Sequence, residues 1–179
     1  FYDSAQLKVV ESGDFCLSDT PEVAGSITWG NLFPRMVTWA LFERVGDGQR
    51  FYLLNTHLPY RDEDEPRRVL GAKAIVARLQ QLHAGVPVIL TGDFNSEPGS
   101  ETYATFTAAL EDARKVAAKV EGPRLTFHNF SGTPTTELDW ILVRGVKVLR
   151  FATLDEKPGG VLPSDHFPVM AEVVLPAGR

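Results

Sequence analysis

The segment Thr91-Gly92-Asp93-Phe94-Asn95 places a carboxylate and a carboxamide two residues apart, directly after the apolar residues 86–90. Residues i and i+2 of a strand lie on one face, and α/β folds build their sites at the carboxyl ends of strands. Asp93 and Asn95 are therefore candidates to bind one ligand together. Gly, Asp and Asn are also ordinary turn residues, so an Asx turn that merely ends a strand is the alternative.

Three further polar clusters border apolar strands. Asn55-Thr56-His57-Leu58 closes an earlier strand, Leu138-Asp139-Trp140-Ile141 opens a later one, and Ser164-Asp165-His166-Phe167-Pro168-Val169 leads into the last. A single His after a strand, such as His57, is more often a hydrogen-bonded edge residue than a catalytic group, and Asp139 alone could cap a turn. Four such clusters in one chain favour a shared site.

In their order along the chain, Asn-Thr-His-Leu, Gly-Asp-Phe-Asn, Leu-Asp-Trp-Ile and Ser-Asp-His-Phe-Pro-Val resemble the motif series of the endonuclease/exonuclease/phosphatase superfamily of metal-dependent phosphoesterases. The resemblance covers residues 34–174, and residues 34–40 are similar to a bacterial branch whose substrates are often unassigned. It implies an α/β fold, a four-layer α/β/β/α sandwich of two mostly antiparallel sheets.

The resemblance also implies a segment that this sequence does not contain. Members of the superfamily begin with a strand that carries an Asn, followed by a Gln-Glu pair whose Glu is the principal metal ligand. Phe1-Tyr2-Asp3-Ser4 is similar to the middle of such a domain, and residues 9–18 resemble the hairpin that follows this Glu. We therefore expect residues 1–179 to be a single, amino-terminally incomplete catalytic domain that lacks its first strands. As an isolated segment it should be poorly soluble and inactive.

By this resemblance the protein is a divalent-metal-dependent hydrolase of phosphoester bonds, either a phosphodiesterase or nuclease or a phosphatase. Asp93 would activate the attacking water, while Asn95 and His166 would bind the phosphate. Asp139 would hold the ring of His166 and favour its charged form. His57 would assist the leaving oxygen or contact the phosphate.

Asp165 and Asp93 are the expected metal ligands, and the ion is expected to be Mg²⁺, with Mn²⁺ as an alternative, because hard cations prefer carboxylate oxygens. Arg35 is expected either to contact the substrate or to be a solvated charge at a strand entry. His83 is interpreted as a helix-end residue and His128 as a surface or substrate-rim residue. A zinc hydrolase would need three or more converging ligands, which four scattered His and one Cys do not favour.

Composition agrees with a single enzyme domain. With 179 residues, 44% of them hydrophobic, the chain can bury a substantial core. No run approaches the roughly 18 apolar residues of a membrane span, and the lone Cys16 excludes an internal disulfide. The net charge of −5 argues against a broad basic face for duplex nucleic acid. We expect a monomer located in the cytoplasm, with an amino-terminal targeting signal left open.

Hydrophobic periodicity predicts more strands than helices. A hairpin is expected around Gly46-Asp47-Gly48 and a second around Arg144-Gly145, and Ser100 is a candidate helix cap. The charged residues 61–68 are interpreted as a solvated lead-in to a helix, and Cys16, Trp29, Trp39 and Trp140 as core. The expected strands are 36–43, 51–54, 86–90, 138–143, 146–151 and 169–175, and the expected helices are 67–83 and 100–110.

The substrate stays open at this point, because such motifs bind the phosphate while the surrounding loops bind the rest. Candidates are nucleic acid, a phosphoinositide, a phospholipid head group and a nucleotide. Residues 59–66 and 125–136 are the loops expected to set specificity. The alternative function is an inactive domain of the same fold that acts as a binding module, and the retained polar clusters argue against it.

Overall fold

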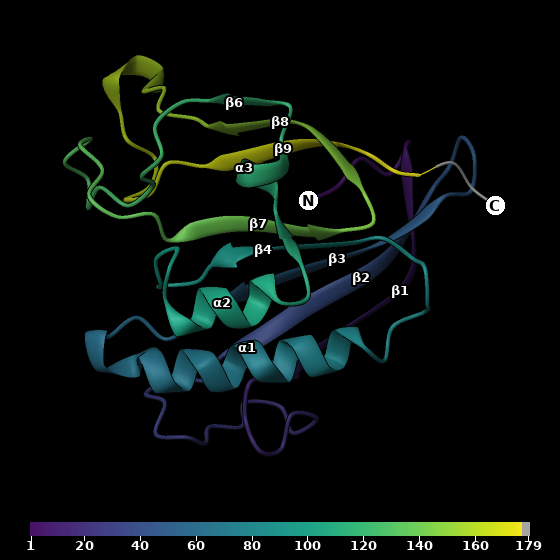
Figure 1. Ribbon diagram of the computed structural model, residues 1–179, viewed down its shortest axis with the longest axis horizontal. Helices are drawn as coiled ribbons and strands as arrows, with labels where there is room; N and C mark the ends of the chain where they lie inside the picture. Colours follow the sequence, from purple (N-terminus) through teal and green to yellow (C-terminus); the bar gives the residue numbers. More distant parts are fainter. Residues whose placement is uncertain (177–179) are drawn as a thin grey trace.

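The computed structural model describes residues 1–176 and contains two β-sheets (Figure 1). Six strands form the larger sheet in the order β1-β2-β3-β4-β7-β5, and three form the smaller one in the order β6-β8-β9. The expected mixed α/β fold with two sheets is confirmed. Most strand pairs are antiparallel, whereas β3 and β4, and also β6 and β8, run parallel. The strands are β1 Leu7–Cys16, β2 Met36–Arg44, β3 Arg50–His57, β4 Val88–Asp93, β5 Glu111–Asp112, β6 Lys119–Glu121, β7 Asp139–Arg144, β8 Lys147–Thr153 and β9 Val169–Val174.

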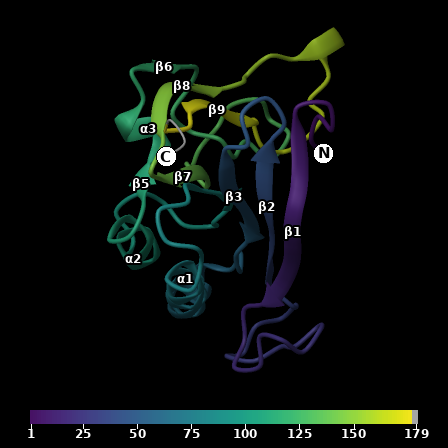
Figure 2. The same ribbon diagram turned by 90° about the vertical axis from the view of Figure 1, so that its right-hand side faces the viewer.

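Helices cover one face of the larger sheet. Helices α1 (Glu65–Leu79) and α2 (Glu101–Thr107) lie side by side there (Figure 2), and among residues 1–176 the only other α-helix is the single turn α3 (Ala113–Val116). Short 3₁₀ turns span Asp62–Asp64 and Pro158–Gly160. Both predicted helices exist, but each ends earlier than predicted. Ser100 caps α2 as expected, since its Oγ accepts a hydrogen bond from the backbone N–H of Tyr103 at 3.0 Å.

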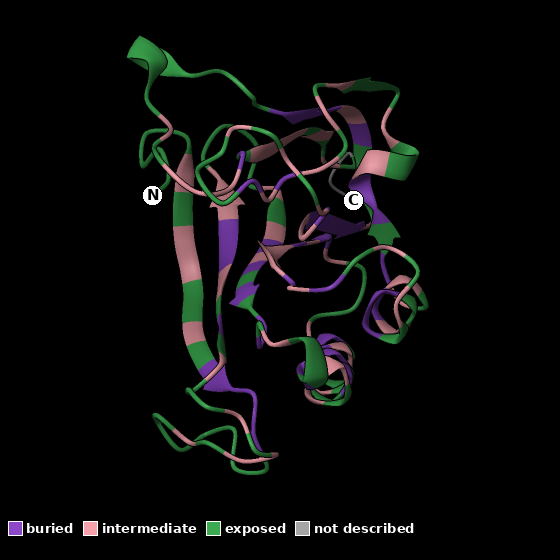
Figure 3. Ribbon diagram, turned by 90° about the vertical axis from the view of Figure 1, so that its left-hand side faces the viewer, coloured by how far each residue is buried: buried purple, intermediate pink, exposed green. Residues whose placement is uncertain are grey.

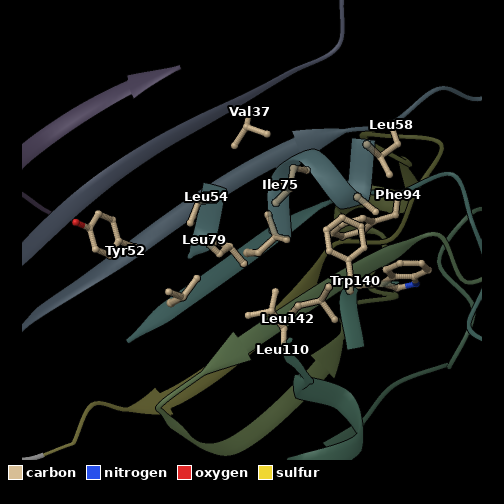
Figure 4. Close-up of a cluster of buried hydrophobic side chains, with 14 of the residues drawn as sticks. Val37, Tyr52, Leu54, Leu58, Ile75, Leu79, Phe94, Leu110, Trp140 and Leu142 are labelled. Carbon is tan, nitrogen blue, oxygen red and sulfur yellow. The ribbon is translucent and has the colours of Figure 1, made fainter. Parts of the chain in front are cut away.

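The main core lies between α1 and the larger sheet. Ala72, Ile75 and Leu79 follow one another at helical spacing on α1 and are almost fully buried. They pack against alternate residues of the strands, among them Leu54 and Leu90 (Figure 4). In contrast, β1 lies at the sheet edge and is mostly half-buried or exposed (Figure 3). The interior strands β3 and β4 both end at polar motifs.

The predicted hairpin at Arg144-Gly145 is wrong. Strand β7 pairs with β4 and β5 in the larger sheet, whereas β8 pairs with β9 in the smaller one. The turn between them passes from one sheet to the other. Ile141 and Val143 of β7 then pack against Val148 and Phe151 of β8 across the space between the sheets, so apolar contact replaces the ladder that a hairpin would make.

Residues 9–18 were expected to form a hairpin, which is also wrong. The segment lies mainly in the single strand β1, which pairs with β2 along its whole length. Gly13 is not a turn residue: it lies opposite Trp39 on β2, and a Cβ built on it would come within 3.2 Å of the indole Nε1. Glycine is needed here so that the ring can lie against the backbone.

Among residues 1–176, no helix combines the length and the apolar character that crossing a membrane requires. Cys16 is buried, as expected, and its thiol is free. Of the three tryptophans interpreted as core residues, Trp140 is fully buried, while Trp29 and Trp39 pack against the core from its margin.

Phe94 anchors the end of β4. Its side chain is completely buried and stacks on Trp140, with ring centroids 4.5 Å apart and an interplanar angle of 13° (Figure 4). The ring of Phe106 in α2 meets the Phe94 ring edge-on, with ring centroids 5.1 Å apart. Because Phe94 stands between Asp93 and Asn95, its burial fixes the backbone that carries both polar side chains.

Phe94→Ala should lower the free energy of unfolding by about 3–5 kcal/mol, since it removes a buried ring and leaves a cavity. Urea unfolding followed by far-UV circular dichroism measures this loss. Phe33→Ala is the matched control, because Phe33 is 55% exposed and its truncation should change stability by less than about 0.5 kcal/mol. Equal effects of the two substitutions would show that Phe94 anchors nothing.

Candidate active site

Three adjacent strands place a polar residue at the same level of the larger sheet. His57 ends β3 and pairs in the parallel register with Asp93, which ends β4. Asp93 in turn pairs in the antiparallel register with Asp139, which opens β7. Directly paired residues point to the same face of a sheet. Residues 57, 93 and 139 therefore form a row across three strands.

Asn95 lies just beyond this row in an unusual backbone conformation. Its φ of 48° is in the left-handed region, which Asn tolerates better than most residues. The backbone N–H of Asn95 donates to Asp93 Oδ1 at 2.9 Å, and its side-chain Nδ2 donates to the carbonyl oxygen of Leu58 at 3.0 Å. The Asx turn considered from the sequence is therefore present, and it links the loop after β4 to the loop after β3.

His166 approaches the row from the segment that precedes β9 of the smaller sheet. Its Nδ1 lies 2.7 Å from Asp139 Oδ2, and its Nε2 lies 3.8 Å from Asp93 Oδ2. His57 Nε2 lies 3.3 Å from the same Asp93 oxygen. The buried hydroxyl of Thr126 holds Asp139 in place, since it accepts hydrogen bonds from the backbone N–H groups of Leu138 and Asp139.

The charges of these groups depend on one another. The hydrogen bond to Asp139 raises the pKa of His166, and the negative charges around the ring outweigh the effect of its burial. Burial raises the pKa of Asp93, and the Asp139 carboxylate adds to this, against the opposing effect of the Asn95 N–H and both imidazoles. Burial also lowers the pKa of His57, together with the charges of Arg35 and His166. His166 is thus the imidazole favoured as a cation, and His57 the neutral one.

The carboxylates and imidazoles described above line one cleft with a volume of about 960 Å³. It brings together all the residues that the sequence singled out as site candidates: Arg35, His57, Asp93, Asn95, Asp139, Asp165 and His166. Arg35 is half-buried, and burial lowers the pKa of its guanidinium although the carboxylates of Asp93 and Asp64 oppose this. His83 lies away from the cleft, where its Nδ1 is 3.1 Å from the hydroxyl of Tyr52.

A group that could hold a metal ion is formed by Asp93, Asp139 and His166, whose ligand atoms all lie within 4.8 Å of one another. Two carboxylates suit a hard divalent cation. Asp165, expected as a ligand, lines the same cleft but is not part of this compact group in the described residues. Asp165 instead presents its backbone oxygen to the N–H groups of His128 and Asn129.

Two interpretations from the sequence need correction because both overlooked burial. His128 is not a surface or rim residue: it is 2% exposed and packs against Phe167 with ring centroids 4.3 Å apart. Residues 61–68 do lead into α1, but the run is not solvated throughout, since Asp64 and Arg68 are buried while Asp62 and Glu63 are exposed. The alternating charges of this run pair with one another, Asp64 with Arg61 and Arg67, and Arg68 with Glu65.

The segments 59–66 and 125–136, expected to set specificity, do contribute to the lining of the cleft, among others through Glu65 and Phe127, whereas Arg68 and Ser96 were not predicted as lining residues. Phe127 meets the ring of His166 with centroids 5.0 Å apart. Glu65, Arg68 and Ser96 contribute polar groups at the foot of the cleft. The spacing of Glu65 and Arg68, three residues apart at a helix start, was the one available signal, because such pairs contact each other on a helix.

Asp139→Asn should lower the pKa of His166, because it removes the largest stabilisation of the imidazolium. A raised folded-state pKa means that the ion pair stabilises the fold below the unfolded-state pKa of about 6.5, and that this contribution is lost as the pH rises through the folded value. The measurement is an NMR titration of the His166 ring protons in metal-free protein. Asp155→Asn, which changes an exposed carboxylate, is the control, and an unchanged His166 titration in Asp139→Asn would contradict the pairing.

The sequence and the fold were compared with known proteins. The chain matches the model of the Endonuclease/Exonuclease/phosphatase family over residues 3–166. A comparison with curated protein sequences finds no match. The solved mannosyl-6-phosphatase of Bacteroides thetaiotaomicron is 31% identical and superposes with a TM-score of 0.90 over 98% of this chain and 70% of that chain.

Two further solved structures resemble the chain. The endonuclease/exonuclease/phosphatase of Bacteroides vulgatus is 32% identical, with a TM-score of 0.91 over 98% of this chain and 69% of that one. The catalytic domain of human Nocturnin shares the fold at 23% identity, with a TM-score of 0.74 over 97% of this chain and 62% of that one. With a family match over most of its length, the chain belongs to the endonuclease/exonuclease/phosphatase family.

Proposed function

We propose that this cleft hydrolyses phosphoester bonds with the help of a divalent metal ion. One observation carries the proposal: Asp93, a carboxylate with a raised pKa, lies between two imidazoles, one of which is hydrogen-bonded to a second carboxylate. A proton acceptor beside a cationic donor is what attack of water on a phosphate requires. The family match supports this chemistry.

In the proposed reaction, the oxygen of the attacking water bonds to phosphorus while Asp93 accepts a proton from that water. His166, held as an imidazolium by Asp139, and the Nδ2 group of Asn95 neutralise the charge that develops on the phosphate oxygens. The bond from phosphorus to the ester oxygen breaks, the departing oxygen, which His57 contacts, takes up a proton from solvent, and Asp93 afterwards releases the proton of the water to solvent. Arg35, at the side of the cleft, binds a phosphate oxygen as a fixed cation.

The metal would be held by carboxylate oxygens of the cleft, and the donor set favours Mg²⁺ or Mn²⁺. Asp93 and Asp165 remain our proposed ligands, and the carboxylate of Asp139 lies close enough to contribute. When bound, a divalent cation supplies positive charge to the phosphate. That residues 1–179 alone bind the ion weakly stays a prediction.

The lining of the cleft favours a small substrate with a single phosphate. Its carboxylates outnumber its guanidinium groups, and the guanidinium of Arg68 is already occupied by backbone carbonyl oxygens. A strand of nucleic acid would need several cations along its phosphates. The carboxylates are Asp62, Glu65, Asp93, Glu97, Asp139 and Asp165, against the guanidinium groups of Arg35 and Arg68.

The remaining groups suit a polyhydroxylated carrier of that phosphate. Asp62, Glu97 and Ser100 offer acceptors and a hydroxyl, and the rings of Tyr60 and Phe127 offer apolar faces. We therefore propose a sugar phosphate in preference to nucleic acid, a phosphoinositide, a phospholipid head group or a nucleotide. A similar solved structure is described as a mannosyl-6-phosphatase, which supports this choice.

A substrate panel tests the proposal. The purified full-length protein that contains residues 1–179 should, with Mg²⁺, release phosphate from mannose 6-phosphate faster than it cleaves bis(p-nitrophenyl) phosphate or a single-stranded oligonucleotide, and EDTA should abolish all activity. Preferential cleavage of the oligonucleotide would overturn the substrate class but keep the reaction. No hydrolysis of any phosphoester, with Mg²⁺ or Mn²⁺, would overturn the reaction itself.

Variants connect the activity to the cleft. Asp93→Asn and Asp139→Asn should each reduce turnover by a factor on the order of 10² to 10⁴, the usual contribution of positioned acid and base groups. Asp155→Asn changes an exposed carboxylate outside the cleft and should leave turnover unchanged. An unchanged rate in Asp139→Asn would show that Asp139 only ends a turn.

A further inference from the structure

The first turn of α1 carries an ion pair in the lining of the cleft, formed by a buried arginine and a half-buried glutamate. Arg68 is 6% exposed, and its Nε donates to Glu65 Oε2 at 2.9 Å. Both side chains line the cleft. Burying a charge costs free energy unless hydrogen bonds satisfy it, so the further partners of this pair show what it holds.

Arg68 holds the loop that follows β3. Its Nη1 donates to the carbonyl oxygens of Pro59, at 2.9 Å, and Arg61, at 2.8 Å. This loop starts directly after His57, and the carbonyl oxygen of Leu58 within it accepts the hydrogen bond from Asn95 Nδ2. The guanidinium of Arg68 thus fixes the loop backbone that accepts the hydrogen bond from the side chain of Asn95.

Glu65 holds the loop that follows β4. Its Oε2 lies 3.0 Å from the hydroxyl of Ser96, and its Oε1 accepts from the backbone N–H of Thr102 at 3.0 Å. Burial opposes ionisation of this carboxyl, but the N–H of Thr102 and the side chains of Arg68 and Ser96 outweigh it and lower the pKa of Glu65. Ser96 directly follows Asn95, so Glu65 reaches the other end of the same polar loop.

We propose that Glu65 and Arg68 form a positioning pair that holds the loops after β3 and β4 at a fixed separation and thereby aims Asn95 at the substrate phosphate. The inference rests on the proposed function for its catalytic consequence. Neither side chain reacts with the substrate in this role. Asn95 depends on such support because its left-handed backbone is a conformation that surrounding structure must maintain.

Arg68→Lys tests the pair with little change in charge or volume. An ammonium cannot donate to Glu65 and to two carbonyl oxygens in the planar arrangement of a guanidinium. A misplacement of about 1 Å costs on the order of 10² in rate, so kcat/KM should fall by about 10 to 100-fold, with the pH profile retained. Glu65→Gln keeps an acceptor for the Thr102 N–H but loses the charge, so its kcat/KM should also be lower than that of the unsubstituted protein.

Arg78→Lys is the matched control. Arg78 lies on the same helix and pairs with Glu22, but it does not line the cleft. Its kcat/KM should equal that of the unsubstituted protein. If Arg68→Lys and Glu65→Gln are also as active as this control, while Asp93→Asn has lost activity, the positioning pair is refuted and the proposed function stands.

A double-mutant cycle tests whether Arg68 affects kcat/KM through Asn95. Asn95→Asp removes the Nδ2 donor but tolerates the same backbone conformation. If Arg68 acts through the loop that holds Asn95, the double variant should lose clearly less than the product of the two single losses. Losses that simply multiply would show that Arg68 supports the fold in general and does not aim Asn95.

A spectroscopic measurement tests the pair without any turnover. In Arg68→Lys the side-chain amide NMR signals of Asn95 should shift and broaden, because its acceptor on Leu58 moves. The same signals should stay unchanged in Arg78→Lys. Asn95 amide signals identical in all three proteins would overturn the inference, whatever the substrate or the activity proves to be.

Discussion

The register between β3, β4 and β7 is the constraint on which the site depends. It places His57, Asp93 and Asp139 opposite one another, and a slip by one residue in any pair would turn a side chain to the opposite face. The register is itself fixed by burial, because residues 88, 90 and 142 of these strands are completely buried. Core packing thus fixes the strand positions from which the polar side chains project.

Burial also determines the electrostatics. Two carboxylates and two imidazoles share the end of the sheet, and each modifies the charge of the others. Asp139 is bonded to His166 and not to His57, so one imidazole is favoured as a cation while the other is not. Asp93, between them, keeps a raised pKa that suits a proton acceptor. The division of roles follows from which carboxylate each imidazole contacts, since the side chains are chemically alike.

The sequence predicted the strand ends and the polar clusters because both are local patterns. Periodicity marks β2, β3 and β4, and the motifs at His57, Asp93, Asp139 and His166 each follow or precede an apolar run. Non-local features were not predictable in the same way. Sheet membership of β7 and β8 depends on which strands they pair with. The burial of Arg68 depends on how the preceding loop folds back onto it, and that of His128 on the ring of Phe167. A charge pattern alone does not distinguish a solvated run from one that is paired and buried.

In the proposed reaction, Asp93, Asn95 and His166 act on one phosphate in the cleft. A crystal structure of the protein with orthovanadate and Mg²⁺ tests this arrangement, because vanadate adopts the five-coordinate geometry of the reaction. We expect vanadate oxygens within about 3 Å of His166 Nε2 and Asn95 Nδ2, with an apical oxygen facing Asp93. Vanadate bound in the cleft but out of reach of Asp93 and His166 would contradict it.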